Sequence, residues 1–260
     1  MTRTYAATLH TGPSATRSGS ARWVDGDVFL EQDTGLLYLR VAGAWQAVRS
    51  GAARFGDATN YVDIATDGHI TLAGTARAWD DIRVEPTVRS AGVNVPSFSQ
   101  WFTNGAGSRG VYLYTFDNAL VAAQKEIFFT CQLPHAWAQT DLYMHVHWLA
   151  ATTAASSKIR WGLEYTWANP GVVFGNTTLI YADTAAGSPA PTGTTDRKHE
   201  ITEFAAMTPT ADQQGMSSML ICRLWRDSAN AADTYTGDVG LLYVDAHFEL
   251  DKLGSNTEYT

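Results

Sequence analysis

Hydrophobic and polar residues alternate along most of the second half of the chain. In the segment 159–167, five large apolar residues occupy every second position, and polar or small residues fill the positions between them. This period of two is typical of a β-strand with one buried face and one wet face. Strand-like patterns occur in eight segments: Arg109–Phe116, Glu126–Leu133, Leu142–Leu149, Ile159–Trp167, Thr177–Tyr181, His199–Phe204, Ser218–Arg226 and Val239–Leu250.

The connections between these segments are polar and rich in glycine and proline. The longest, Thr184–Lys198, contains Pro189 and Pro191 and predicts a surface loop. The sequence shows no long helical pattern and no repeat of 20–50 residues. We therefore predict an all-β protein whose C-terminal part is a jelly-roll-like β-sandwich.

The first part of the chain carries shorter strand patterns. Met1–Ala21 is polar, which predicts an extended arm. Apolar runs on either side of Asp33-Thr34-Gly35 predict a β-hairpin, and those around Asp67-Gly68 predict a second small β unit. The chain divides into three predicted regions: an arm and hairpin at 1–50, a small β unit and linker at 51–94, and the β-sandwich at 95–260.

Composition narrows the range of partners. The net charge of −8, without any Lys/Arg cluster, argues against nucleic acid as a partner. No apolar run is long enough for membrane insertion, and the N-terminus lacks a signal-peptide core, so we expect synthesis in the cytoplasm. Charged residues make up 17%, below the usual quarter or so, which indicates a surface that partly contacts other chains. Cys131 and Cys222 stand in apolar runs and are expected to be buried free thiols.

Catalytic and cofactor motifs are missing. The sequence contains no phosphate-binding loop, no Gly-x-Ser-x-Gly elbow and no Cys-x-x-Cys metal knuckle. Carboxylates such as Glu164, Asp227 and Asp245 are candidates for the acid pair of a glycan hydrolase, but any β protein of this size has such carboxylates. We therefore expect a protein that is not an enzyme and has no cofactor, with a glycan hydrolase or a metal enzyme as the less favoured alternative.

One group of residues could bind a metal ion. His145 and His147 lie two apart on a predicted strand, so both rings project from the same face, as in the His-x-His of cupins. The Glu that cupins place four or five residues later is replaced by Ala151 and Thr152. The last predicted strand presents further groups on one face: Asp245, His247 and Glu249. We favour polar faces that pack against a subunit or water, with no metal, and keep a structural metal site as the alternative.

The strand Arg109–Phe116 is apolar on both faces. Tyr112, Tyr114 and Phe116 alternate with two further apolar residues and a threonine. Such a strand lies between two layers or at a subunit interface. We take these three aromatic residues as interface candidates, with sugar stacking as the alternative role.

Several motifs, in order along the chain, resemble segments of tailed-bacteriophage virion proteins of the fibre, spike or head-decoration type. Near the N-terminus the resemblance covers Gly26–Phe29 through Asp33–Tyr38 to Gly43–Trp45, and then Phe55–Tyr61 through Gly74 to Trp79–Asp81. Further motifs are Leu133-Pro134-His135, His145-Val146-His147-Trp148, Trp161-Gly162-Leu163-Glu164-Tyr165, Arg223-Leu224-Trp225-Arg226-Asp227 and Asp245-Ala246-His247-Phe248-Glu249.

The resemblance implies a structural protein of the virion. We expect a homotrimeric appendage that docks on other virion proteins, of the capsid, neck or tail, through its N-terminal region and displays the β-sandwich outward. A capsid decoration protein and a module that binds host surface glycan are the alternatives. The resemblance supplies no catalytic residues.

Overall fold

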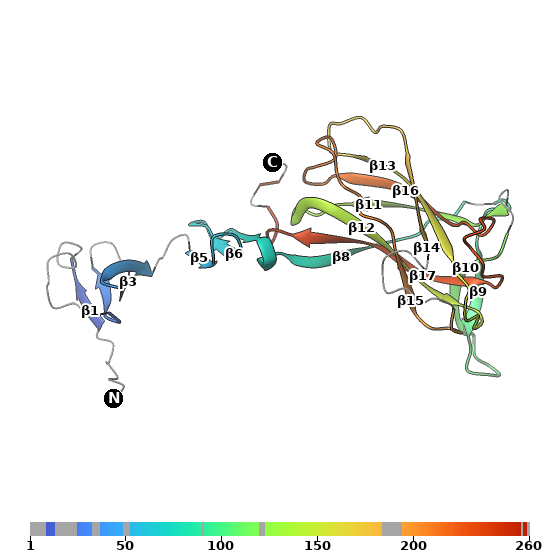
Figure 1. The fold of residues 1–260 in the computed structure, drawn as a ribbon, viewed down its shortest axis with the longest axis horizontal. Coiled ribbons are helices and arrows are strands. Elements are labelled where there is room, and N and C mark those ends of the chain that lie inside the picture. The colour runs from blue at the N-terminus through green and yellow to red at the C-terminus, as the bar shows by residue number, and fades with distance from the viewer. Residues whose placement is uncertain are drawn as a thin grey trace. The chain divides into compact units, whose positions relative to one another are not determined.

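Figure 1 shows the computed structural model of the chain, which describes residues 9–13, 25–32, 37–48, 53–89, 91–119, 123–183, 194–255 and 257–258. Apart from one 3-10 turn at Gly74–Ala76, the regular elements in these ranges are all β-strands. The chain separates into two compact units, Met1–Ala76 and Arg77–Thr260.

The N-terminal unit contains two small sheets. The first has the order β1-β2-β3-β4 and the second the order β5-β6-β7. Their bounds are Leu9–Gly12, Val28–Glu31, Leu37–Val41, Ala44–Val48, Ala53–Gly56, Tyr61–Ile64 and Ile70–Ala73, from β1 to β7. Strand β1 pairs in parallel with β2, so part of the predicted arm is a strand, and most of the rest of the arm lies outside the described residues.

Local turn chemistry sets the hairpins of this unit. Strands β2 and β3 pair as predicted, although the turn residues 33–36 between them lie outside the described residues. Ala42 and Gly43 join β3 to β4, and both have positive φ, as a two-residue hairpin loop requires. Asp67-Gly68 connects β6 to β7, and Gly68 also has positive φ. The predicted second β unit is therefore present.

Among its described residues, the N-terminal unit buries almost no hydrophobic side chains. Phe29 is the one hydrophobic side chain that is buried among the unit's described residues, and it packs edge-on against Trp45. No described residue of β5, β6 or β7 is buried. Small sheets of this kind depend on an additional hydrophobic surface for their stability.

The second unit is a sandwich of two sheets. One sheet, here the histidine sheet, has the order β15-β12-β17-β10-β9, and β8 also pairs with β17. The facing sheet has the order β11-β16-β13-β14. The bounds are Ala78–Val84, Ser97–Phe102, Val111–Phe116, Glu126–Gln132, Trp137–Ala150, Arg160–Ala168, Thr178–Asp183, Glu200–Glu203, Met219–Arg226 and Val239–Leu250, from β8 to β17.

The connectivity of β10 to β17 is that of a jelly roll. These eight strands correspond to the eight predicted segments, and they form two antiparallel sets of four, β15-β12-β17-β10 and β11-β16-β13-β14. Except between β13 and β14, each connection crosses from one sheet to the other. The predicted β-sandwich of jelly-roll type is confirmed.

The core lies between the two sheets and is rich in tryptophan. Trp148 and Trp161 are fully buried, and the Trp161 ring meets Phe116 edge-on at 5.3 Å between ring centroids. On β12 the alternation predicted from the sequence is confirmed, because Leu142, Met144 and Val146 all face the core. Cys131 and Cys222 are buried and free, and burial raises the pKa of Cys131 to about 12.

A β-bulge shifts the core-facing positions of the last strand. His147 pairs with Tyr243, but the next residue, Trp148, pairs with Leu241. Leu242 is therefore displaced from the ladder and only half-buried, whereas Leu241 is buried in the core. Strict alternation from Val244, Ala246 and Phe248 would place Leu242 on the inner face, and the bulge is the reason that it does not lie there.

The buried guanidinium of Arg226 fixes the connection between β16 and β17. Its Nε and Nη2 donate to the two carboxylate oxygens of Asp233 at 2.9 and 2.8 Å, and Nη1 donates to the carbonyl oxygen of Gly237 at 2.7 Å. Nη2 also donates to the carbonyl oxygen of Tyr235. This bidentate pair satisfies a charge that would otherwise be costly to bury.

The sandwich unit begins before the predicted boundary at Val95. Strand β8 pairs with β17 from Ala78 to Val84. The backbone N–H groups of Thr87 and of Phe128, in the facing sheet, each donate to the other residue's carbonyl oxygen. The sequence pattern at 76–83 fits either a helical turn or a strand, and the structure shows a strand at Ala78–Val84. Much of the predicted region 51–94 is thus part of the sandwich.

We predict that a fragment 77–260 unfolds cooperatively and is more stable than a fragment 95–260 by at least about 2 kcal/mol. The shorter fragment loses the buried side chain of Val84 and exposes one edge of β17. Urea unfolding followed by tryptophan fluorescence measures the difference. Equal stability of the two fragments would show that β8 adds nothing to the sandwich.

Candidate functional site

The outer face of the histidine sheet concentrates the titratable residues singled out in the sequence. Strands β15, β12, β17 and β8 lie side by side there, and their side chains form rows across the sheet. One row contains Glu203, His145, Asp245 and Arg83. The next row contains Tyr143, His247 and Asp81. The strand pairing thus brings together His145, His147, Asp245 and His247, as the metal alternative required.

His145 lies between two carboxylates. Its Nε2 is 3.0 Å from Oε2 of Glu203 on β15, and its Nδ1 is 3.2 Å from Oδ1 of Asp245 on β17. Both neighbours are direct cross-strand partners of His145 in the antiparallel ladders. Directly opposed side chains approach one another most closely in such ladders, which explains the short distances.

His147 is buried although it belongs to the outer face. The ring of Tyr243 stacks on it at 3.9 Å between centroids, and Nδ1 of His147 is 2.8 Å from Nε2 of His199. Nε2 of His147 lies 3.0 Å from Oδ2 of Asp245. The two histidines therefore approach the two oxygens of the same carboxylate.

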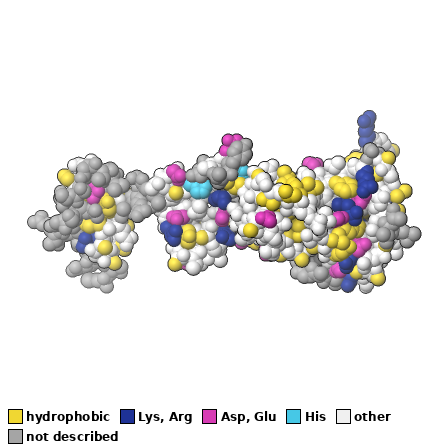
Figure 2. Space-filling model, turned by 90° about the horizontal axis from the view of Figure 1, so that it is seen from above, with side chains coloured by type: hydrophobic (Ala, Val, Ile, Leu, Met, Phe, Trp, Pro, Cys, Tyr) yellow, Lys and Arg dark blue, Asp and Glu magenta, His cyan; other side chains and the backbone are white. Residues whose placement is uncertain are grey.

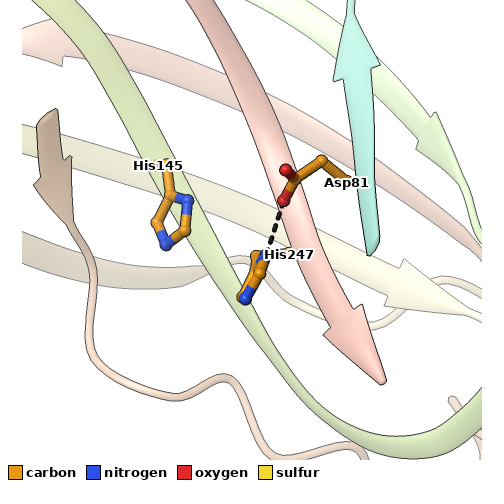
Figure 3. Close-up of side chains that lie close together, drawn as sticks. All are labelled: Asp81, His145 and His247. Carbon is orange, nitrogen blue, oxygen red and sulfur yellow. Dashed lines mark hydrogen bonds and ion pairs between the residues drawn. The ribbon is translucent and has the colours of Figure 1, made fainter. Parts of the chain in front are cut away.

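His247 forms a separate pair beside this group, as Figure 3 shows. Its Nδ1 is hydrogen-bonded to Oδ1 of Asp81 at 2.5 Å, and the ring of Trp79 stacks on it at 4.7 Å. The ring centroids of His145 and His247 are 5.1 Å apart. Because Asp81 is exposed, this pair lies in contact with water, unlike Asp245.

The carboxylates and imidazoles of this group stabilise one another's charged forms. Burial alone would raise the pKa of Asp245, but the imidazoles of His145 and His147 keep it down at about 2. Burial would likewise lower the pKa of His145, but Asp245 and Glu203 outweigh burial and raise it above the ordinary value of 6.5. The pKa of His199 is lowered by burial and by the neighbouring His147.

Two sets of side chains have geometry compatible with a metal ion. In the described part of the chain, ligand atoms of His145, His147 and Asp245 lie within 4.8 Å of one another, and so do those of Asp81, His145 and His247. Glu249 is in neither set. Its carboxylate lies 3.3 Å from the guanidinium of Arg77 and from the hydroxyl of Thr140.

Some residues of this face were missed from the sequence alone. Trp79 and Asp81 lie in a segment that the pattern left undecided between helix and strand, and Glu203 lies on a short strand with few apolar positions. Local alternation predicts which face a residue takes but not which strand is its neighbour. The Trp79-Asp80-Asp81 motif of the phage resemblance was the one signal that could have pointed to β8.

The three aromatic interface candidates lie in different surroundings. Phe116 is fully buried in the sandwich core, so its assignment to an interface is wrong, because β10 passes over Trp161 of the facing sheet at that point. Tyr112 is exposed and stacks on the exposed ring of Phe98. Tyr114 is partly buried against the core and also contacts Phe98. For Tyr112 and Tyr114 the interface role stays a prediction.

A shallow depression of about 460 Å³ adjoins the outer face of the histidine sheet. The exposed Trp79 and the ring of Tyr143 lie on one part of its lining. Polar groups able to bond a hydroxylated ligand complete the lining: Gln139, Thr140, Asp141, Thr208, Gln214 and Glu249. An aromatic surface surrounded by amides and carboxylates can bind an apolar ring face and hydrogen-bond its polar edge.

No family model and no curated protein matches this chain. Among solved structures, one from work on the promiscuous specificity of carbohydrate-binding modules of the β-sandwich superfamily shares 8% identity. The similarity covers 86% of this chain and 88% of that chain, with a TM-score of 0.24. A score this low says nothing about what the present chain binds. Among the described residues, no helix is long and apolar enough to cross a membrane.

We predict that Asp245→Ala lowers the free energy of unfolding by about 1–3 kcal/mol, because it leaves His145 and His147 without the carboxylate that they both face. Asp81→Ala, which removes an exposed carboxylate from the adjacent strand, should cost less than about 0.5 kcal/mol. Urea unfolding in the presence of EDTA compares the two variants. Equal losses would contradict the central position of Asp245.

Proposed function

We propose that this chain is a non-catalytic structural subunit of a tailed-phage virion. In this proposal it forms a homotrimer, docks on other virion proteins through its N-terminal unit and displays the jelly roll outward. The order of the sequence motifs supports the proposal, and so does the contrast between the two units of the fold.

The observation that carries the proposal is the scarcity of buried hydrophobic side chains in the described part of the N-terminal unit. Phe29 is the single buried hydrophobic side chain among its described residues, and the sheet β5-β6-β7 has no buried residue at all. Phe55, on β5, is 63% exposed. A unit of this kind gains stability when equivalent sheets from other copies, or the surface of a particle, cover its apolar side chains.

The sandwich unit also supports the proposal, because it buries a hydrophobic core of its own. Its own core is continuous, so it can stand away from the particle without a partner. The outer face of the facing sheet still exposes Ile221, Leu179 and Tyr181. In Figure 2, hydrophobic side chains lie among Lys and Arg side chains on the surface of the sandwich.

We predict that the full-length protein has about three times the chain mass of 28.3 kDa in light scattering. Phe55→Ser should weaken the trimer because it removes an exposed aromatic from the sheet without a core. Phe174→Ser, which alters an exposed phenylalanine of the sandwich, should leave the mass unchanged.

Two results would count against this arrangement. A full-length protein that stays monomeric at micromolar concentration would contradict the homotrimer. A trimeric fragment 77–260 would move the contact to the sandwich, where Phe98 and Tyr112 are exposed, and would favour the capsid decoration alternative.

A second candidate function, binding of host surface glycan, is favoured by the depression beside Trp79. The indole of Trp79 stacks on the ring of His247, which holds it in place. Trp79 is still 49% exposed, beside the polar groups that line the depression. A rigid exposed aromatic of this kind suits a saccharide ring, whose hydroxyls the amides and carboxylates can bond. This function is compatible with a virion appendage.

We predict that Trp79→Ala lowers affinity for host surface polysaccharide about thirtyfold, which corresponds to about 2 kcal/mol for an aromatic hot spot. Phe98→Ala removes another exposed aromatic, outside this depression, and should have no effect. Calorimetric titration with polysaccharide from the host cell surface makes the comparison. If both variants bind like the wild type, the depression is not a glycan site.

A further inference from the structure

We propose that His145, His147 and Asp245 form a binding site for one divalent transition-metal ion of the zinc class. This inference goes beyond the proposed function and does not depend on it. The sequence alone favoured a polar packing face without metal. The tertiary arrangement of the donor atoms changes that preference.

Two buried polar atoms without a hydrogen bond provide the first argument, and one of them belongs to Asp245. Its Oδ1 makes no hydrogen bond among the described residues and lies 3.2 Å from Nδ1 of His145. The other ring nitrogen of His145, Nε2, is hydrogen-bonded to Glu203, so Nδ1 is the nitrogen that faces Asp245. A cation at this position would bind both Nδ1 and the carboxylate.

His147 approaches the same carboxylate from the other side. Its Nδ1 is hydrogen-bonded to Nε2 of His199, and either nitrogen can be the donor. Its buried Nε2 makes no hydrogen bond within the described chain, although it is 3.0 Å from Oδ2 of Asp245. A single divalent cation between the three side chains would bind Nδ1 of His145 and Nε2 of His147 together.

Among the described residues no lysine or arginine pairs with Asp245, and its near neighbours are the imidazoles of His145 and His147. Asp245 is 3% exposed, and an unpaired carboxylate at that depth is strongly disfavoured. Arg83 is its partner in the ladder, but the guanidinium lies over the ring of Tyr243 at 4.4 Å. No ion pair joins Arg83 to Asp245 in the part of the chain that the structure describes.

The distances and the supporting residues agree with zinc-class coordination. Zinc binds nitrogen and oxygen at about 2.0–2.2 Å, so neighbouring ligand atoms in a tetrahedral site are about 3.3 Å apart. Nδ1 of His145 is 3.2 Å from Oδ1 of Asp245, and Nε2 of His147 is 3.0 Å from Oδ2. One ligand atom from each of the three residues lies within 4.8 Å of the others. Metal-binding histidines usually have the second ring nitrogen bonded to a carboxylate or another polar group, as Glu203 and His199 do here.

The neighbouring set that includes His247 is less suited to an ion. Asp81 and His247 already satisfy one another by a hydrogen bond, and Asp81 is exposed (Figure 3). His145 belongs to both sets but has only one nitrogen that is not bonded to Glu203. The site also projects from the face opposite the hydrophobic core. A structural role, joining β12 to β17 and supported from β15, follows from this position.

The test uses untagged full-length protein that has been treated with EDTA and dialysed. Titration with ZnCl₂ in a calorimeter should show one ion per chain, and elemental analysis should find the same stoichiometry after removal of excess metal. Zinc should also raise the melting temperature, because the ion binds only the folded site. Cobalt(II) should give the visible absorption of a low-symmetry, nitrogen-coordinated ion.

Matched variants locate the site. His147→Gln and Asp245→Asn should lose the bound ion, whereas His247→Gln should keep it. Glu203→Gln should keep the stoichiometry but weaken affinity about 10- to 100-fold. Circular dichroism establishes that each variant is folded.

The wild-type measurement decides the question even where a variant fails to fold. A folded wild-type chain that binds no zinc and shows no thermal shift would overturn the proposal and leave a protonated His145 as the cation beside Asp245. Binding that is lost with His247→Gln but survives His147→Gln would overturn the assignment of ligands.

Discussion

The antiparallel register between β12 and β17 is the constraint on which both the core and the candidate site depend. These are the two longest strands, and each has one face in the core and one face outside. The register that places Val146 opposite Val244 inside also places His145 opposite Asp245 outside. A slip of one residue would turn every side chain to the other face, so the hydrophobic core itself stabilises the polar group.

The outer face illustrates how a buried polar group can persist on a sheet that faces away from the core. Tyr243 and His199 cover His147, and Trp79 covers His247. These aromatic contacts reduce access of water and strengthen the interactions between the charges. The β-bulge at Leu242 marks the end of this region. On its far side the register between β17 and β12 is shifted by one residue.

The two units reflect two different sources of stability. The sandwich contains the tryptophan-rich core and the Arg226–Asp233 pair, so its own side chains supply what it needs. The N-terminal unit is formed by turn chemistry and strand pairing, with Phe29 as the one buried hydrophobic residue described in it.

The sequence by itself determined the eight strands of the jelly roll, most of their inward faces and the hairpin turn at Gly68, because alternation and turn chemistry are local properties. Only the tertiary structure decided that 78–84 is a strand, that Phe116 is buried and that Leu241 replaces Leu242 in the core. Glu203 and Asp81 became neighbours of the histidines through pairing between distant segments. Pairing is selected by the packing of whole sheets, and no pattern within a single segment contains that information.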